Sequence, residues 1–382
     1  MIYLDNAATS WPKPPEVIDS MQSFLAKAGN PGRAAHKLSV DAARVVYDTR
    51  ESVANLFNVL NPLRIIFTLN ATHALNLAIQ GLLKPGDQAL VTGVEHNSVM
   101  RPLRHLEKSG IGVNVARCSN DGRVDLNYLA DDVARIKPKL IAVNHASNVT
   151  GTLQDIKAIS KIAHINGALL LVDAAQTAGV IPIDIQEMGI DLLAFSGHKG
   201  LLGTTGTGGL VINNSIDTSM MEPIVFGGTG SRSEHEIQPE YLPDKFESGT
   251  PNSIGLAGLG AGIKYIMQMG IGQIRNHDIM LTKMLIDGLS SINGIHIYGT
   301  KDPSISTSVL SFTIENMSVS DIGMQLEEDF GILTRVGLHC APAAHKTIGT
   351  FPHGTVRLSP GIFTTKEDIT NTILAIERIS SK

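Results

Sequence analysis

The sequence predicts an α/β protein: a mostly parallel sheet with helices on both faces, followed by a smaller C-terminal α/β domain. Short aliphatic runs alternate with helix-like stretches between residues 64 and 212. These runs are apolar at consecutive positions, which is typical of strands buried on both faces of a parallel sheet. The chain has 382 residues, more than one hydrophobic core usually holds, so we expect two domains.

Seven strands are expected in the first domain, each a short run rich in aliphatic residues. They fall at residues 64–68, 88–92, 112–116, 140–144, 169–173, 192–196 and 209–212. Apolar residues recur at helical spacing in 71–83, 99–108, 126–135 and 155–165, and the run Lys-Pro-Gly-Asp at 84–87 ends the first of these helices. Ligands of such sheets bind at the carboxyl ends of the strands, so side chains just after each strand are candidates for binding.

The C-terminal part has a different pattern. Residues 226–251 are rich in Gly, Ser, Glu and Pro, and we interpret them as a surface or interface loop. A long helical region follows from about 252 to 291. Strands at 295–298, 308–313 and 355–358, with a helix at 320–330, then indicate the second domain.

Composition excludes several classes of protein. A net charge of -5 argues against non-specific nucleic-acid binding, which needs a basic face. No apolar run approaches the ~20 residues of a membrane helix. The first residues lack the basic and apolar regions of a secretory signal. Two cysteines are too few for a disulfide framework, so we expect a cytoplasmic protein that binds neither nucleic acid nor membrane.

Lys199 is the strongest candidate for chemistry. It follows the predicted strand 192–196 in the run Ser-Gly-His-Lys-Gly, where its amine would point into the crevice at the strand ends. Desolvation there lowers the pKa of a lysine and allows its amine to form a Schiff base. The alternative is a plain loop lysine beside a glycine-rich turn.

Asp173 ends another apolar run, Leu-Leu-Leu-Val-Asp, 26 positions upstream of Lys199. A carboxylate at this place suits the nitrogen of a pyridine ring, because it keeps that nitrogen protonated and makes the ring an electron sink. In isolation, Asp173 could equally be the N-cap of a helix.

Two further strand ends carry polar side chains. Asn70, Ala71 and Thr72 lie where a strand joins a helix, and the free amides of a helix start favour phosphate binding. His96 follows the next strand, where an imidazole could stack on an aromatic cofactor. A merely capped helix and a structural histidine are the alternatives.

Cys340 lies in the second domain within the run Arg-Val-Gly-Leu-His-Cys at 335–340. An arginine and a histidine near a thiol favour its thiolate, so Cys340 is a candidate nucleophile. A buried, inert thiol is the alternative, and it is the interpretation we give to Cys118. Arg357 is a candidate for binding a carboxylate.

Together these motifs resemble the class V aminotransferase-type enzymes that use pyridoxal 5′-phosphate (PLP), and among them the SUF-type (group II) cysteine desulfurases and selenocysteine lyases. The resemblance spans nearly the whole chain. The matching runs are 3–9 (Tyr-Leu-Asp-Asn-Ala-Ala-Thr), 95–98 (Glu-His-Asn-Ser), 147–151 (Ser-Asn-Val-Thr-Gly), 173–176 (Asp-Ala-Ala-Gln), 196–199 (Ser-Gly-His-Lys), 247–252 (Glu-Ser-Gly-Thr-Pro-Asn) and 335–341.

The resemblance implies a fold-type I homodimer with PLP near the subunit interface. It implies an N-terminal segment, 1–15, that packs with the small domain, a large domain at 16–259 and a small domain at 260–382. Lys199 would form the Schiff base, Asp173 would pair with the pyridine nitrogen, and His96 would stack on the ring. The other implied cofactor contacts are Ala71, Thr72, Asn148, Gln176, Ser196, His198 and, from the partner subunit, Thr250.

The implied reaction takes sulfur from L-cysteine, or selenium from L-selenocysteine. Cys340 would accept the sulfur as a persulfide, with release of L-alanine and possible transfer to an acceptor protein. The implied substrate-binding residues are Asn148, Arg357, Arg335 and His36. Leu338 departs from the family, which usually has a polar residue before the His-Cys pair.

Three functional hypotheses remain open from the sequence. The first is a cysteine desulfurase that uses Lys199 and Cys340. The second is a selenocysteine lyase or other carbon–sulfur lyase, in which Cys340 serves only discrimination between substrates. The third is a catalytically silent scaffold with the same fold. A nucleotide-binding loop at 203–209 is disfavoured because its glycines precede a strand and not a helix.

Overall fold

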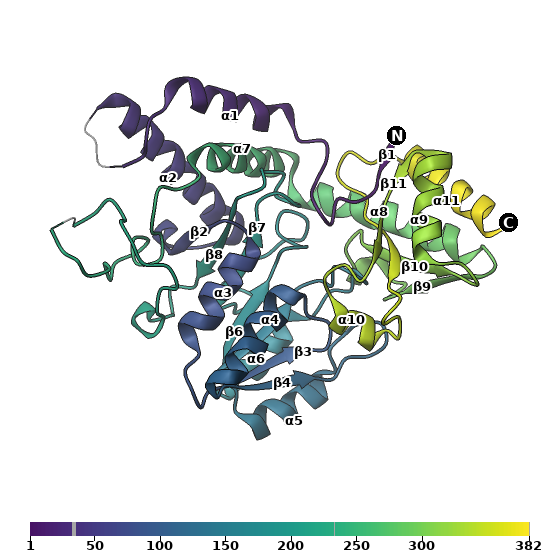
Figure 1. The fold of residues 1–382 in the computed structure, drawn as a ribbon, viewed down its shortest axis with the longest axis horizontal. Helices are drawn as coiled ribbons and strands as arrows, with labels where there is room; N and C mark the ends of the chain where they lie inside the picture. The colour runs from purple at the N-terminus through teal and green to yellow at the C-terminus, as the bar shows by residue number, and fades with distance from the viewer. Residues whose placement is uncertain (33–35, 233, 382) are drawn as a thin grey trace.

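The structure, a computed structural model, describes residues 1–32, 36–232 and 234–381 and consists of a larger and a smaller unit (Figure 1). The larger unit contains the strands β2 (Ile65–Thr68), β3 (Gln88–Thr92), β4 (Gly112–Ala116), β5 (Leu140–Asn144), β6 (Leu169–Asp173), β7 (Leu192–Ser196) and β8 (Gly208–Ile212). Its helices are α1 (Pro15–Lys27), α2 (Lys37–Phe57), α3 (Ala71–Leu82), α4 (Asn97–Leu106), α5 (Leu126–Ile136), α6 (Ile156–Ile165) and α7 (Ser253–Met269), with short 3-10 turns η1 (Pro62–Arg64), η2 (Glu107–Ser109) and η3 (Thr218–Met220).

The seven strands form one sheet in the order β2-β8-β7-β6-β5-β3-β4. All neighbours from β7 to β4 are parallel, and β8 runs antiparallel to both β7 and β2. Successive residues of β7 enter opposite hydrophobic cores: Leu193 packs under α2, α5, α6 and α7, while Leu192 packs under α3 and α4. The predicted α/β fold with a mostly parallel, two-sided sheet is therefore confirmed.

The smaller unit lies at one end of the molecule, where both chain termini are found (Figure 1). Its antiparallel sheet has the order β12-β13-β10-β9, and a two-stranded parallel pair joins β1 to β11. Its strands are β1 (Ile2–Tyr3), β9 (Ile295–Tyr298), β10 (Leu310–Ile314), β11 (Ile332–Leu333), β12 (Arg335–Gly337) and β13 (Thr355–Leu358). Its helices are α8 (Ile271–Ser290), α9 (Val319–Phe330), α10 (Pro342–Thr347) and α11 (Lys366–Ser380), with the 3-10 turn η4 (Pro303–Ile305).

The N-terminal segment belongs to the smaller unit by its contacts. Ile2 and Tyr3 pair with β11, and Leu4 is fully buried in the core beneath the four-stranded sheet. The chain then crosses to the larger unit at α1. Only the first few residues contact the smaller unit, because Thr9, Ser10 and Lys13 hydrogen-bond to the turn at His198 and Lys199 in the larger unit. The expected packing of residues 1–15 and the domain bounds stay a prediction.

Several features differ from the sequence prediction. Helices α1, α2, α10 and α11 were not anticipated, and the helical region after residue 252 is two helices instead of one. The break lies at Gly270, whose φ of 82° suits glycine, and α7 and α8 meet there at 80°.

In the described part of the chain, no single helix is long and apolar enough to cross a membrane. The bent pair α7 and α8 passes that test only when the two helices are taken together, by length and composition.

Candidate active site

A cavity of about 280 Å³ opens at the carboxyl ends of the sheet strands, against the smaller unit. It collects most of the side chains that the sequence singled out. From the larger unit and the N-terminal segment come Ala7, Ala8, Asn70, Ala71, Thr72, His96, Ser98, Asn144, Ala146, Asn148, Asp173, Ala175, Gln176, Ser196, His198 and Lys199, and from the smaller unit come Arg335, His339, Cys340 and Arg357.

Lys199 is half-buried in the turn that follows β7. Burial lowers the pKa of its amine to about 8, an effect that the nearby carboxyl of Asp173 partly opposes. The turn depends on flanking glycines: a Cβ at Gly197 would clash with Oγ1 of Thr207, and one at Gly200 would meet a backbone oxygen at 2.5 Å. Lys199 is thus a lysine with a readily released proton, as its position in the sequence predicted.

Asp173 ends β6 with its carboxyl buried in the wall of the same cavity. Its Oδ1 accepts the N–H of Ala175 at 2.9 Å. Burial raises the pKa of this carboxyl, and that hydrogen bond and the amine of Lys199 both lower it. Residues 174–180 form turns and no helix, so Asp173 is not a helix N-cap. A cationic ligand group beside it would be strongly favoured.

The start of α3 offers donors for an anion. Asn70 caps the helix by accepting the N–H of His73 at 2.9 Å, so the capped-helix interpretation also holds. The N–H of Ala71 contacts Oγ of Ser196 at 3.2 Å, and the hydroxyl of Thr72 contacts that of Ser98 at 2.7 Å. Helix N-termini of this kind favour phosphate groups.

Two histidines beside this helix start have neutral rings. His96 caps α4 by accepting the N–H of Ser98 at 3.1 Å, and burial lowers its pKa to about 4. Burial, followed by the charge of Lys199, also lowers the pKa of His198 to about 4. Nδ1 of His198 is buried and has no hydrogen-bond partner among the described residues. Both rings can therefore stack on or hydrogen-bond a ligand near neutral pH without adding charge.

Arg357 is 2% exposed and reaches the cavity from β13. It donates to Oδ1 of Asp5 at 2.7 Å and to the carbonyl of Asn148 at 3.1 Å, while its Nε has no partner in the described part of the chain. Asn148 in turn donates to the carbonyl of His339 at 2.7 Å. Gln176 is tied to the N-terminal segment through the carbonyl of Ala7 at 3.1 Å. These hydrogen bonds fix the guanidinium of Arg357 in a position where it could bind the carboxylate of a ligand.

Cys340 lies on the loop after β12, which we call the cysteine loop (residues 338–341). Its thiol is exposed, and its φ of 58° follows a φ of 48° at His339, so two non-glycine residues in succession are left-handed. The N–H of Asn97 on α4 donates to the carbonyl of Cys340 at 2.9 Å. The thiol of Cys340 is therefore not buried in this chain, and its role as a nucleophile stays a prediction.

His339 does not behave as the sequence suggested. It is buried, its Nε2 contacts the hydroxyl of Thr355 at 3.2 Å, and burial together with Arg357 lowers its pKa to about 2. A neutral ring cannot stabilise a thiolate by its charge. The expectation that a charged His339 assists Cys340 is wrong, and Arg335 remains as the cation of that run that lines the cavity.

Two predicted site residues do not line this cavity. His36 is exposed and caps α2, accepting the N–H of Ser39 at 3.3 Å. Thr250 is exposed in the 226–251 loop and lines a separate cavity of about 440 Å³ beside Arg50 and Glu247. Its role as a partner-subunit residue stays a prediction, as does the role of His36.

The sequence analysis missed Asn144, which lies at the end of β5 and lines the cavity. The rule that ligands gather at carboxyl strand ends would have found it. Behind it, the buried Glu95 accepts the N–H of Asn144 at 3.0 Å and the hydroxyl of Thr92 at 2.5 Å. Burial raises the pKa of Glu95 to about 8, so this carboxyl is mostly protonated at neutral pH.

Comparisons with known proteins agree with this geometry. Residues 2–372 match the family model described as aminotransferase class-V. A probable cysteine desulfurase of Methanothermobacter thermautotrophicus is 39% identical, with 96% of this chain and 92% of the relative covered. A probable cysteine desulfurase of Pyrococcus abyssi is 35% identical, with 99% and 94% covered.

Solved structures are similar over the same extent. The apo cysteine desulfurase of Thermococcus onnurineus has a TM-score of 0.93 and 33% identity, with 100% of this chain and 94% of that chain covered. The cysteine desulfurase CsdA of Escherichia coli has a TM-score of 0.86 and 30% identity, with 98% and 94% covered. Enzymes of this class depend on PLP. The chain therefore belongs to the class V aminotransferase family, and within that family it is similar to proteins that carry the name cysteine desulfurase.

Proposed function

We propose that this chain is a PLP-dependent cysteine desulfurase that transfers the sulfur of L-cysteine to Cys340 and releases L-alanine. One observation carries the proposal: Lys199, Asp173 and Cys340 line the same cavity although they come from different units of the molecule. The names of the relatives support the same activity.

The residues around the cavity fit PLP. Lys199 would hold the aldehyde carbon, Asp173 would pair with the ring nitrogen, and the neutral ring of His96 would stack on the cofactor. The start of α3 with Ser196 and His198 would bind the phosphate, and the unpartnered Nδ1 of His198 is suited to that contact. Gln176 would bind the ring hydroxyl. When bound, PLP supplies an electron sink for the carbanion at the substrate Cα.

The chain's own groups would then orient the substrate and move protons. Arg357 and Asn148 would bind the substrate carboxylate, with Arg335 beside them. Near a pKa of about 8, the amine of Lys199 can both take a proton from Cα and return it. Asp173 would remain an anion next to a cationic ring.

Cys340 would accept the sulfur. Its thiolate would attack the substrate sulfur, so that an S–S bond forms while the C–S bond breaks, and the electron pair of the C–S bond ends in a new C–H bond of alanine. The net reaction balances as L-cysteine plus the Cys340 thiol giving L-alanine plus a Cys340 persulfide. The exposed thiol suits onward transfer to an acceptor protein.

A homodimer is part of the proposal. Thr250 is exposed and distant in sequence from the groups at the start of α3, and it does not line the cavity of its own chain. A phosphate contact by Thr250 would therefore come from the partner subunit. Analytical ultracentrifugation tests this point, and a protein that stays monomeric when loaded with PLP would contradict it.

The decisive experiment compares the two cysteines. After turnover with L-cysteine under non-reducing conditions, we expect the wild-type protein to gain the mass of one sulfur atom on the peptide that contains Cys340. Cys340→Ala should keep the bound cofactor and its visible absorbance but lose alanine formation, whereas the matched control Cys118→Ala should keep both. Unchanged alanine formation by Cys340→Ala would exclude the persulfide route.

A further inference from the structure

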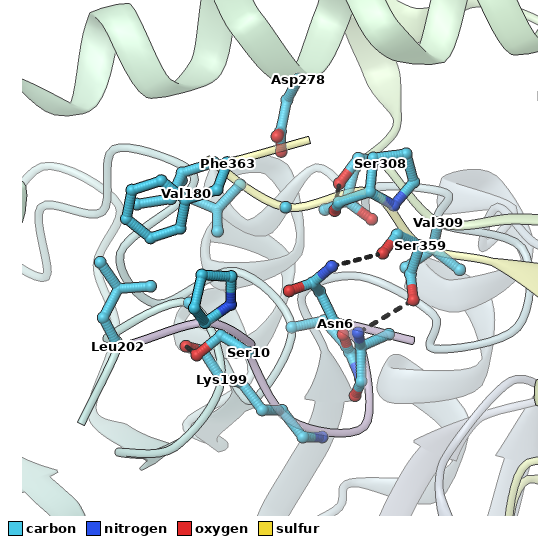
Figure 2. A pocket seen from close by; sticks show the side chains of 18 residues that line it. Asn6, Ser10, Val180, Lys199, Leu202, Asp278, Ser308, Val309, Ser359 and Phe363 are labelled. Carbon is cyan, nitrogen blue, oxygen red and sulfur yellow. Dashed lines mark hydrogen bonds between the residues drawn. The ribbon is translucent and has the colours of Figure 1, made fainter. Parts of the chain in front are cut away.

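A second cavity, which we call the junction cavity, lies where the N-terminal segment, the larger unit and the smaller unit meet (Figure 2). The cavity has a volume of about 50 Å³, which is several times the roughly 10–15 Å³ that one water molecule needs. The lining residues on which the argument depends are Asn6, Val180, Leu202, Asp278, Ser359 and Phe363.

The junction cavity is distinct from the candidate active site. The two share only Ala7, Gln176 and Lys199 in their walls. Figure 2 shows the side chain of Lys199 running away from Asp278, on the opposite side of the cavity. The proposed catalytic amine therefore does not explain the polar group at the other end.

That polar group is the carboxyl of Asp278 on α8. Figure 2 shows it directed into the cavity. Asp278 is 2% exposed, and its Oδ2 has no hydrogen-bond partner in the part of the chain that the structure describes. A buried carboxyl oxygen without a partner is unfavourable, and such atoms are rare unless something outside the chain binds them.

The chain does not supply a partner for Oδ2 although a cation is near. Arg275, one helical turn earlier, donates to the carbonyl oxygens of Ser306, Pro303 and Ser304 at 2.6 to 3.0 Å. No ion pair joins Arg275 to Asp278 among the described residues. Burial raises the pKa of Asp278 to about 7, although the charge of Arg275 and a hydrogen bond from the Ser308 hydroxyl both lower it, so the carboxyl is partly protonated at neutral pH and a cation beside it would favour the ionised form.

One wall of the junction cavity is apolar. Val180, Leu202 and Phe363 lie side by side in Figure 2, across from the polar groups of Asn6 and Ser359. A molecule that fills the cavity would thus have an apolar body on one side and a hydrogen-bond donor at one end. Recognition sites for small organic cations combine these two features: a carboxylate for the charge and an apolar wall for the body.

We propose that the junction cavity binds a compact organic cation, whose N–H donors pair with Oδ2 of Asp278 and whose apolar body packs on Val180, Leu202 and Phe363. The walls come from the N-terminal segment, the larger unit and the smaller unit, and Lys199 is one of the lining residues. A ligand in the cavity would therefore contact both units next to Lys199. The cavity is therefore a second small-molecule site, separate from the one that binds the amino-acid substrate.

The test uses the PLP-loaded protein and two probes of the same shape. Isobutyramidinium carries the charge, its neutral counterpart isobutyramide does not, and an amidinium does not condense with the cofactor aldehyde as a primary amine would. Calorimetric titration should give one saturable site for isobutyramidinium with a Kd of about 1 mM, as befits a ligand of this size. Isobutyramide should bind at least about tenfold more weakly.

Three variants test whether the probes bind in the junction cavity. Asp278→Asn should remove the preference for the cation, while Asp302→Asn, which removes the other acidic neighbour of Arg275 outside the cavity, should leave it unchanged. Phe363→Ala, at an exposed wall position, should weaken both probes by a similar factor. If Asp278→Asn does not fold, the proposal is still tested by comparing the two probes on the wild-type protein and by a crystal soaked with isobutyramidinium.

The proposal is overturned by any of three results: no saturable binding of isobutyramidinium, equal binding of the charged and neutral probes, or a crystal in which Oδ2 of Asp278 contacts only water at saturating probe. An Asp278→Asn variant that binds the cation as tightly as wild type overturns it as well.

Discussion

Lys199 and Cys340 line one cavity, but the molecule holds them in different ways. Lys199 follows a strand whose residues are all buried, and its amine is set by the sheet beneath it. Cys340 lies on a loop of the smaller unit, exposed, with a left-handed backbone and a hydrogen bond from Asn97 to its carbonyl. This difference fits the proposed roles, because a group that transfers protons needs a fixed place and a shifted pKa, whereas a thiol that passes sulfur to an acceptor needs to be accessible.

Electrostatics separates the two regions as well. Burial lowers the pKa of Lys199 to about 8, and Asp173 sits across from it. Next to Cys340, the ring of His339 is kept neutral by burial. The surroundings at the end of the sheet thus shift the pKa of Lys199, whereas the cysteine loop determines where the thiol of Cys340 lies and keeps it exposed.

The largest effect is expected at Lys199. Lys199→Ala should lose the visible absorbance of bound cofactor and lower alanine formation by more than about 10³-fold, because it removes the group that we propose binds the aldehyde and moves the proton. The exposed Lys161 on α6 is the control, and Lys161→Ala should match wild type. Substantial turnover by Lys199→Ala would mean that the sheet end is not the catalytic region.

The free energy of unfolding should depend more on residues of the sheet than on residues of the cysteine loop. Leu193 in β7 is fully buried, so Leu193→Ala should lower the free energy of unfolding by about 2–5 kcal/mol in urea denaturation. Leu338 in the cysteine loop is only half-buried, and Leu338→Ala should cost less than about 1 kcal/mol. Equal losses at both positions would show that the loop is as firmly packed as the sheet.

Thiol reactivity sharpens the contrast within the chain. Burial raises the pKa of Cys118 to about 11, compared with about 8.5 for a free cysteine. At pH 7.5, iodoacetamide should therefore modify Cys118 about 300-fold more slowly than free cysteine, and label the exposed Cys340 first. Peptide mapping over time measures both rates. Faster labelling of Cys118 than of Cys340 would contradict the interpretation of Cys118 as the buried, less reactive thiol.

The smallest effect concerns pH. Only the neutral amine of Lys199 can attack the cofactor aldehyde, so capture of PLP by cofactor-free protein should speed up by about tenfold per pH unit below pH 8 and level off above it. Asp173→Asn should move the inflection to lower pH, since the carboxylate raises the pKa of Lys199. An inflection near the ordinary lysine value would contradict the buried setting of the amine.

Much of the larger unit could be predicted because its strands are buried on both faces. The structure confirms the strands at 88–92, 112–116, 140–144, 169–173 and 192–196 at the predicted residues. Helices α1 and α2 were missed. In α2 several apolar residues, among them Leu38, Val40 and Tyr47, are exposed, so the apolar stripe that marks a helix is blurred.

The same reason explains what was predictable at the site. Residues after parallel strands meet at one edge, which brought Lys199, Asp173 and His96 together in advance of any structure. The state of His339 could not be foreseen, because its burial comes from contacts with residues farther away in the sequence, such as Asn148 and Thr355. Short-range sequence pattern carries no information on that packing.

The pairing of β1 with β11 has a consequence for how the molecule is made. Ile2 is synthesised long before Ile332, with which its strand pairs, and Asp5 is synthesised long before Arg357, whose guanidinium donates to it. Contacts so far apart in the chain form late in folding. The segments that carry Asp5 and Arg357 are therefore expected to complete their side of the pocket later than the central sheet, whose strands are closer together in the chain.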